Sequence, residues 1–277
     1  MAAHAHDNAY GRTPYYVLTG GLAIVFLFPL LWSLLASVSP QAATGQRVGY
    51  GLGNYTTLYT FGAGLPRVAL NSAYLSALTV LITLVMSTLG GYAFARFTFW
   101  GRDVLFLLTL SILMVPFATL IIPLYVLLNA FGLTNSLFGV ALIVAMFQLP
   151  FATFMMRISF EAIPRELEES ALIDGCGTFG VLWRVMVPSV VPGLVTVGLF
   201  AFLAAWNEFF APLIMLTDPM KQTLPVAVAN LRQQTMGAID YGATQAGVVV
   251  MAVPCIILFL LLQRYYVRGF MAGAVKG

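Results

Sequence analysis

The acidic side chains of this chain are concentrated in one interval, residues 159–188, which we call the charged loop. The chain is 60% hydrophobic and only 8% charged, yet five of its 10 Asp and Glu residues lie in this interval. They are Glu161, Glu166, Glu168, Glu169 and Asp174. Carboxylates on a helix can form charge pairs with basic groups of a partner, or they can face water.

Local signals predict how these acids are positioned. Pro164 suits the first turn of a helix, where its missing N–H has no partner to lose. Glu166 and Glu168 follow near the positive end of the helix dipole, which favours carboxylates. Gly175 and Gly177 end the helix, because glycine accepts a left-handed turn. A short apolar segment follows, so we predict a helix, a glycine turn and a short helix.

The faces of the first helix suggest two roles. At 3.6 residues per turn, one side carries apolar and small residues, namely Ile163, Leu167, Ser170 and Ala171. Another side carries Glu166, Glu169 and Ile173, and Arg165 and Glu168 point to the remaining side. The helix either sits in a partner's groove with charge pairs at the rim, or lies on the chain's own membrane face with its acids in water.

The composition places the chain in a membrane. Its mean hydropathy is +0.92, and a membrane helix needs about 20 apolar residues. Six segments qualify: Tyr15–Ser37, Val68–Ala95, Val104–Leu128, Leu137–Ile158, Val187–Leu216 and Thr244–Val267. We therefore predict an all-α membrane protein with six transmembrane helices over residues 15–268, an N-terminal tail (1–14) and a C-terminal tail (269–277). Prolines in five of the six spans predict interrupted helices.

The basic residues predict the orientation. With the N-terminus inside, most of the 13 Lys and Arg residues fall on the cytoplasmic side, as the positive-inside rule requires. Both termini and the charged loop are then cytoplasmic. We expect a multi-pass membrane protein.

Several kinds of activity find no support in the sequence. A phosphate-binding loop ends in Lys-Ser or Lys-Thr, and the only lysines, Lys221 and Lys276, lack that context. We therefore expect no ATP hydrolysis by this chain and no bound cofactor. His4 and His6 stand in a polar tail without other ligands, so we predict no metal site. The net charge of +3 is small and is no evidence for nucleic-acid binding, and we expect no nucleic-acid partner.

One polar group lies inside a predicted span. Glu208 is the only acid there, and with Asn207 and Trp206 it offers hydrogen bonds and a stacking face of the kind that sugars use. A carboxylate inside a membrane is a functional candidate by default. The group could line a translocation path, or it could pair with a neighbouring helix or subunit, and both roles stay open.

The charged loop resembles the EAA loop of ABC-type import permeases. The signature reads Glu169-Ser170-Ala171, three residues, Gly175, nine residues, then Val185-Met186-Val187-Pro188. Ser170 replaces the first alanine of the signature. Further stretches resemble carbohydrate-type importer permeases, namely Tyr92-Ala93-Phe94-Ala95-Arg96, Trp206-Asn207-Glu208-Phe209 and the tail Ala272–Gly277, which is similar to that of maltose-type permeases.

The resemblance implies a coupling role for the loop. The helix would dock into a cytoplasmic ATPase, with Glu169 paired to a basic group, Gly175 making the turn and Asp174 capping or bracing it. Leu167, Ser170, Ala171 and Pro188 belong to the same coupling set. Tail residues Gly273, Lys276 and Gly277 would reach into the ATPase dimer.

The resemblance also implies a location in a bacterial inner or plasma membrane, and it implies partners. These are a second, different permease subunit, two ATPase subunits that bind ATP and Mg²⁺, an external solute-binding protein and a sugar or oligosaccharide. An importer for another solute class, such as polyamine or phosphate, is the nearest alternative. A secondary carrier or channel that acts alone is the alternative from another class.

Overall fold

A computed structural model describes residues 9–39, 50–233 and 240–274. Within these ranges the chain is helical and contains no strand, which confirms the predicted fold class. The chain forms two compact units: Met1–Tyr59 with Val228–Val250, and Thr60–Ala227 with Met251–Gly277.

The first unit is held together by a small polar cluster. Its helices are α1 (Ala9–Ser37), α2 (Gly53–Thr60) and parts of α12 (Leu224–Gln233) and α13 (Tyr241–Ala274). The amide of Asn54 donates to the carbonyl oxygens of Ser37 (2.8 Å) and Ser39 (3.1 Å). The hydroxyls of Ser37 and Tyr55 share a hydrogen bond of 2.9 Å. These bonds tie α2 to the end of α1, whose apolar side chains are otherwise exposed along its length.

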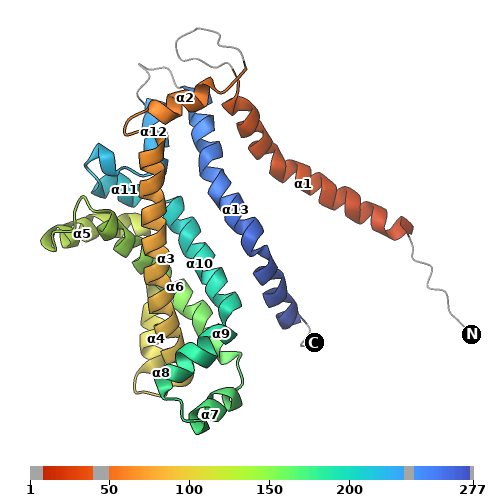
Figure 1. Cartoon of the computed structure of the whole chain (residues 1–277), viewed down its shortest axis with the longest axis vertical. Coiled ribbons are helices and arrows are strands. Elements are labelled where there is room, and N and C mark those ends of the chain that lie inside the picture. Colours follow the sequence, from red (N-terminus) through yellow and green to blue (C-terminus); the bar gives the residue numbers. More distant parts are fainter. Residues whose placement is uncertain (1–8, 40–49, 234–239, 275–277) are drawn as a thin grey trace, which may run out of the picture. The chain divides into compact units, whose positions relative to one another are not determined.

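The second unit is built on three long helices that pack against one another, α3 (Leu65–Arg96), α6 (Leu137–Glu161) and α10 (Val191–Trp206). Shorter elements surround them (Figure 1): α4 (Arg102–Ser111), η1 (Ile112–Met114), α5 (Phe117–Ala130), α7 (Arg165–Ile173), α8 (Thr178–Val181), η2 (Leu182–Met186), α9 (Val187–Ser189), α11 (Phe210–Met215) and η3 (Pro219–Lys221).

Small residues bring α3 close to its neighbours. Its buried hydroxyl residues recur every three or four positions and so share one face: Ser72, Ser76, Thr79, Thr83 and Ser87. A Cβ at Gly91 would lie 2.5 Å from the Cβ of Met156 on α6. Small side chains at a membrane helix interface permit this approach, so α3 and α6 form a tight pair.

Among the residues that the structure describes, four helices are long and apolar enough to cross a membrane: Pro14–Ser37, Leu65–Arg96, Leu137–Glu161 and Tyr241–Arg264. They correspond to the predicted first, second, fourth and sixth spans. Two further pairs pass the same test but are sharply bent, Arg102–Met114 with Phe117–Ala130 by 106° and Thr178–Ser189 with Val191–Trp206 by 79°. Counting each pair as one span gives six. The third and fifth predicted spans are thus each divided by a sharp bend.

Prolines explain these bends. Pro116 pushes the preceding Val115 into an extended conformation (φ −89°, ψ 122°), which ends η1 before α5. Pro192 stands in the first turn of α10, directly after the bend at Val190. In a continuous helix the ring of Pro212 would clash with the carbonyl of Glu208, and the fifth span accordingly breaks between α10 and α11.

The other prolines do not interrupt their helices. Pro29, Pro150 and Pro254 lie inside α1, α6 and α13, each of which continues past its proline. The prediction that proline would interrupt five spans was therefore correct only for the third and fifth.

Two buried apolar clusters mark the two ends of the second unit. The loop-end cluster joins α3, α6 and α10 to the charged loop and includes Tyr92, Phe160, Ala171, Val181 and Met186. The far-end cluster lies near α5 and α11 and includes Leu75, Val140, Ala205, Ala211 and Met215. The charged loop is thus packed onto one end of the helix bundle.

Candidate functional site

The first helix of the charged loop, α7, has the predicted ends. Pro164 precedes it in an extended conformation (φ −57°, ψ 141°) and Glu166 and Glu168 lie in its first turn. Gly175 is left-handed (φ 85°). Its N–H donates to Leu172 O and the N–H of Cys176 donates to Ala171 O, both at 3.0 Å. This pair of bonds is a Schellman cap, and it fixes the turn after Asp174.

The second short helix departs from the prediction at its start. Gly177 has φ −71° and precedes α8, so it begins this helix and does not end α7. The chain then passes through a π-helical turn, η2, into α9. Pro188 lacks the N–H that would bond Arg184 O, which favours an irregular turn at this point. Val181, Leu182 and Met186 are buried in the loop-end cluster and anchor the segment.

The buried face of α7 is narrower than the predicted apolar stripe. Ala171 is 8% exposed and packs in the loop-end cluster, with Ile163 against it. Leu167 and Ser170 are exposed. The chain itself therefore covers part of the stripe and leaves the rest open.

The face of α7 that points away from Ala171 mixes acids with apolar groups. Glu169, Ser170 and Asp174 are exposed, and Ile173 is 85% exposed. On the neighbouring α8, Phe179 is 68% exposed. We call Glu169, Ser170, Ile173 and Phe179 the exposed surface of the charged loop; Leu167 and Leu172 lie at its edges. Exposed large apolar side chains that gather on a polar segment form a surface that a partner can cover.

Glu168 is the acid of α7 that points inward. Its Oε1 accepts a hydrogen bond from the hydroxyl of Tyr92 at 2.6 Å. Its Oε2 lies 3.4 Å from Nε of Arg96, an ion pair longer than a good hydrogen bond. The side chains of Arg96 and Glu168 are only 5% and 17% exposed. Tyr92 and Arg96 are four residues apart on α3 and therefore share a face.

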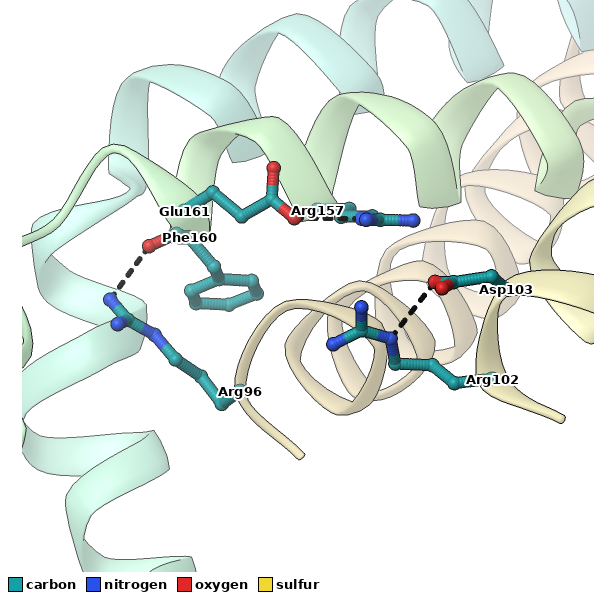
Figure 2. A network of polar contacts seen from close by, with 6 residues as sticks. All are labelled: Arg96, Arg102, Asp103, Arg157, Phe160 and Glu161. Carbon is teal, nitrogen blue, oxygen red and sulfur yellow. Dashed lines mark hydrogen bonds and ion pairs between the residues drawn. The ribbon is translucent and has the colours of Figure 1, made fainter. Parts of the chain in front are cut away.

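Arg96 also closes the end of α6. Its Nη2 donates to Phe160 O and to Ile163 O, each at 2.7 Å. The last carbonyls of a helix lack intrahelical partners and attract a cation. Figure 2 shows Arg96 reaching Phe160, with two further pairs nearby: Arg157 with Glu161 (2.8 Å) and Arg102 with Asp103 (3.0 Å).

At the far end of α10, the structure separates the roles of Trp206, Asn207 and Glu208. Trp206 is 5% exposed, stacks on Phe202 and donates from Nε1 to Met251 O at 2.9 Å. Asn207 is exposed and donates to Leu203 O at 2.8 Å. One Glu208 oxygen accepts from the N–H of Ala211 at 3.0 Å, which caps α11.

The remaining predicted residues can be placed only in part. Gly273 lies in the last turn of α13, and Lys276 and Gly277 lie outside the described residues. Over the described ranges, no three His, Cys, Asp or Glu side chains form a group that could hold a metal ion.

Sequence reasoning missed the partners of Glu168. The segment Tyr92–Arg96 stood out only by its resemblance to carbohydrate-type importer permeases, and Glu168 was expected on the third side of its helix. Two polar residues four apart at the end of an apolar span, facing a loop rich in acids, are a signal that could have indicated this contact.

About two thirds of the chain matches the model of a known protein family. Residues 86–271 match the model described as "Binding-protein-dependent transport system inner membrane component". The match includes the whole charged loop and the 206–209 segment.

Individual proteins extend the similarity to nearly the whole chain. It is 35% identical to the arabinooligosaccharides transport system permease protein AraQ of Halalkalibacterium halodurans, over 92% of this chain and 93% of that protein. It is 31% identical to the trehalose/maltose transport system permease protein MalG of Thermococcus litoralis, over 92% and 94%. A chain of a bacterial ABC transporter for import of the acidic polysaccharide alginate has the same fold, with TM-score 0.75 and 22% identity over 96% of this chain and 100% of that chain.

Proposed function

Because the chain belongs to the family of binding-protein-dependent transport system inner membrane components, we propose that it is the permease subunit of an ATP-driven importer for a sugar or oligosaccharide. Similarity over more than nine-tenths of its length to permeases named for arabinooligosaccharides and for trehalose or maltose supports the sugar assignment. The chain would form half of the translocation path.

The assembly that we propose contains three further kinds of component. A second, different permease subunit completes the path, and two ATPase subunits bind ATP and Mg²⁺ and hydrolyse the nucleotide. A solute-binding protein outside the membrane delivers the sugar. Both termini and the charged loop face the cytoplasm, as the distribution of Lys and Arg favours.

The observation that carries the coupling assignment is the exposed surface of the charged loop. Ile173 and Phe179 are 85% and 68% exposed on a segment whose polar residues place it outside the bilayer. We propose that this surface docks on an ATPase subunit, with Ile173 and Phe179 in an apolar groove and Glu169 paired to a basic group at its rim. Gly175 and Asp174 set the angle of the helix, and the Gly273–Gly277 tail makes a second contact.

The translocation path is proposed at the other end of α10. Asn207 is exposed there, and one oxygen of Glu208 has no partner in the described chain. Both could bond water or a sugar hydroxyl. Trp206 would act on the path indirectly, because its ring is buried and holds the end of α10 against α13.

Charge reversal tests the docking. In the complex purified from its host, Glu169→Lys should sharply reduce the amount of ATPase that co-purifies and abolish sugar-stimulated ATP hydrolysis. The sugars to test are arabino-oligosaccharides, maltose and trehalose. The control is Asp103→Lys, which reverses an exposed acid on α4, outside the charged loop. Full ATPase retention and normal stimulation in Glu169→Lys would remove the docking assignment.

A further inference from the structure

The only side-chain hydrogen bond and ion pair between α7 and α3, within the described part of the chain, are those that Glu168 makes with Tyr92 and Arg96. We call these three residues the Glu168 link. Apart from this link, α7 packs mainly on α8 and η2. We propose that the Glu168 link transmits movement of the charged loop to α3, so that Glu168 is a positioning residue for energy coupling. The inference rests on the proposed function.

The link is strong because it is shielded from water. Arg96 and Glu168 are 5% and 17% exposed, so water competes weakly for their charges. Tyr92 is held by ring contacts on two sides, 5.4 Å from Phe160 and 5.5 Å from Phe97 between ring centroids. Its hydroxyl therefore has one fixed direction, toward Glu168.

Arg96 makes the link stiff. Its Nη2 is already bonded to two carbonyl oxygens, Phe160 at the end of α6 and Ile163 just before α7. The same guanidinium thus joins α3, the end of α6 and the start of α7. A pull on α7 cannot rotate Arg96 freely, because these bonds hold it in place.

The helix α3 is suited to carry the displacement onward. It has 32 residues, which corresponds to about 48 Å, and no proline after its first turn. It is one uninterrupted helix, whereas the pairs α4–α5 and α9–α10 turn by 106° and 79°. Tight packing along its hydroxyl face makes α3 move as a rigid body together with α6.

The far end of α3 is fastened to another segment, residues 219–224. Asn71 donates to Met220 O and Gln222 O, both at 2.9 Å. The hydroxyl of Ser72 accepts from the N–H of Leu224 at 2.8 Å. Helix α3 thus makes polar contacts at both ends. Movement of the charged loop that reaches α3 through Glu168 is passed on to residues 219–224.

The test measures both ends in the whole complex. Tyr92→Phe removes only the hydroxyl that donates to Glu168, and Glu168→Gln removes the charge. Each variant is combined with Met220→Cys as a reporter, since Met220 is 50% exposed, in a background where Cys176 and Cys255 are replaced. The rate of maleimide labelling is measured with and without MgATP and vanadate. The matched control is Glu161→Gln, which removes an acid paired with Arg157 inside a single helix.

We expect the parent and Glu161→Gln to change their Met220→Cys labelling rate when nucleotide is added. In Tyr92→Phe and Glu168→Gln, the nucleotide-dependent change in the labelling rate should be at least about fivefold smaller than in the parent. Fivefold is the lower end of the range for coupling between distant sites. Both should retain their ATPase subunits, since the exposed surface is intact. The double variant should be no worse than the more affected single one, because both remove the same contact.

Two results would overturn the proposal. One is a full nucleotide response in Tyr92→Phe with the ATPase bound; the other is a parent complex whose Met220→Cys labelling ignores nucleotide. Failure of docking has a different signature, since in that case Glu169→Lys would retain the ATPase. Should Glu168→Gln fail to accumulate, Tyr92→Phe alone decides, because its ring packing is unchanged.

Discussion

The charged loop and the break at residues 207–209 lie at the two ends of α9–α10 and use their acids differently. In the loop, Glu168 is paired with side chains of α3, while Ile173 stays 85% exposed. At the break, Glu208 bonds the backbone of the helix that follows, and Trp206 is buried at 5% exposure. The polar groups at the break thus bond largely within the chain, whereas the loop keeps an apolar surface that the described chain leaves uncovered.

The largest effect is expected at Trp206. Trp206→Ala removes a buried ring and the bond to Met251 O, and should cost about 3–5 kcal/mol of stability. Trp206→Phe keeps much of the ring and should cost about 1 kcal/mol for the lost hydrogen bond. Thermal unfolding of the solubilised complex measures both. An unchanged Tm in Trp206→Ala together with lost uptake would instead make Trp206 a substrate-binding residue.

Backbone conformation at the loop provides a second, smaller effect. Gly175 has φ 85° and Gly177 has φ −71°, and a Cβ at either would have open space. The same change at both positions therefore isolates backbone strain. Gly175→Ala should cost about 1–2 kcal/mol and reduce ATPase co-purification, while Gly177→Ala should do neither. Equal behaviour of the two variants would show that the Schellman turn does not set the angle of α7.

The smallest effect concerns the cap that Glu208 supplies. Glu208→Ala should destabilise α11 by about 0.5–2 kcal/mol, and Glu208→Gln should stay close to the parent because its carbonyl still accepts. Hydrogen exchange of the Ala211 amide reports this directly. If Glu208→Gln reduces sugar uptake as much as Glu208→Ala does, while the exchange rate of the Ala211 amide is unchanged, then the charge of Glu208 acts on the translocation path and not on α11.

Patterns that depend on neighbouring residues were predictable from sequence. The helical class, four unbroken spans and the Gly175 turn follow from apolar runs and from glycine, both local properties. The bends at Pro116 and Val190 lie in two of the five spans in which prolines predict an interruption. Composition could not single out these two spans, because it does not say whether a proline kinks a helix or breaks it. Pro150 and Pro254 sit in continuous helices, so the same residue has both outcomes.

Contacts between distant segments could not be predicted. Glu168 lies 76 positions after Tyr92, and only the packing of α7 on the loop-end cluster brings them together. The same holds for Trp206, whose indole partner is the backbone of Met251, a group that any residue type would offer. The predicted apolar stripe on α7 is only partly buried. Ala171 packs against the rest of the chain, whereas Leu167 and Ser170 are exposed.

The most direct test of the docking claim is labelling of Ile173→Cys by maleimide in inside-out vesicles, with and without the ATPase subunits. The control position is Trp100→Cys, which is 98% exposed in the connection between α3 and α4. We predict fast labelling at both positions without the ATPase, and loss of labelling only at Ile173→Cys when the ATPase is bound. Equal labelling of Ile173→Cys in both preparations would contradict the account.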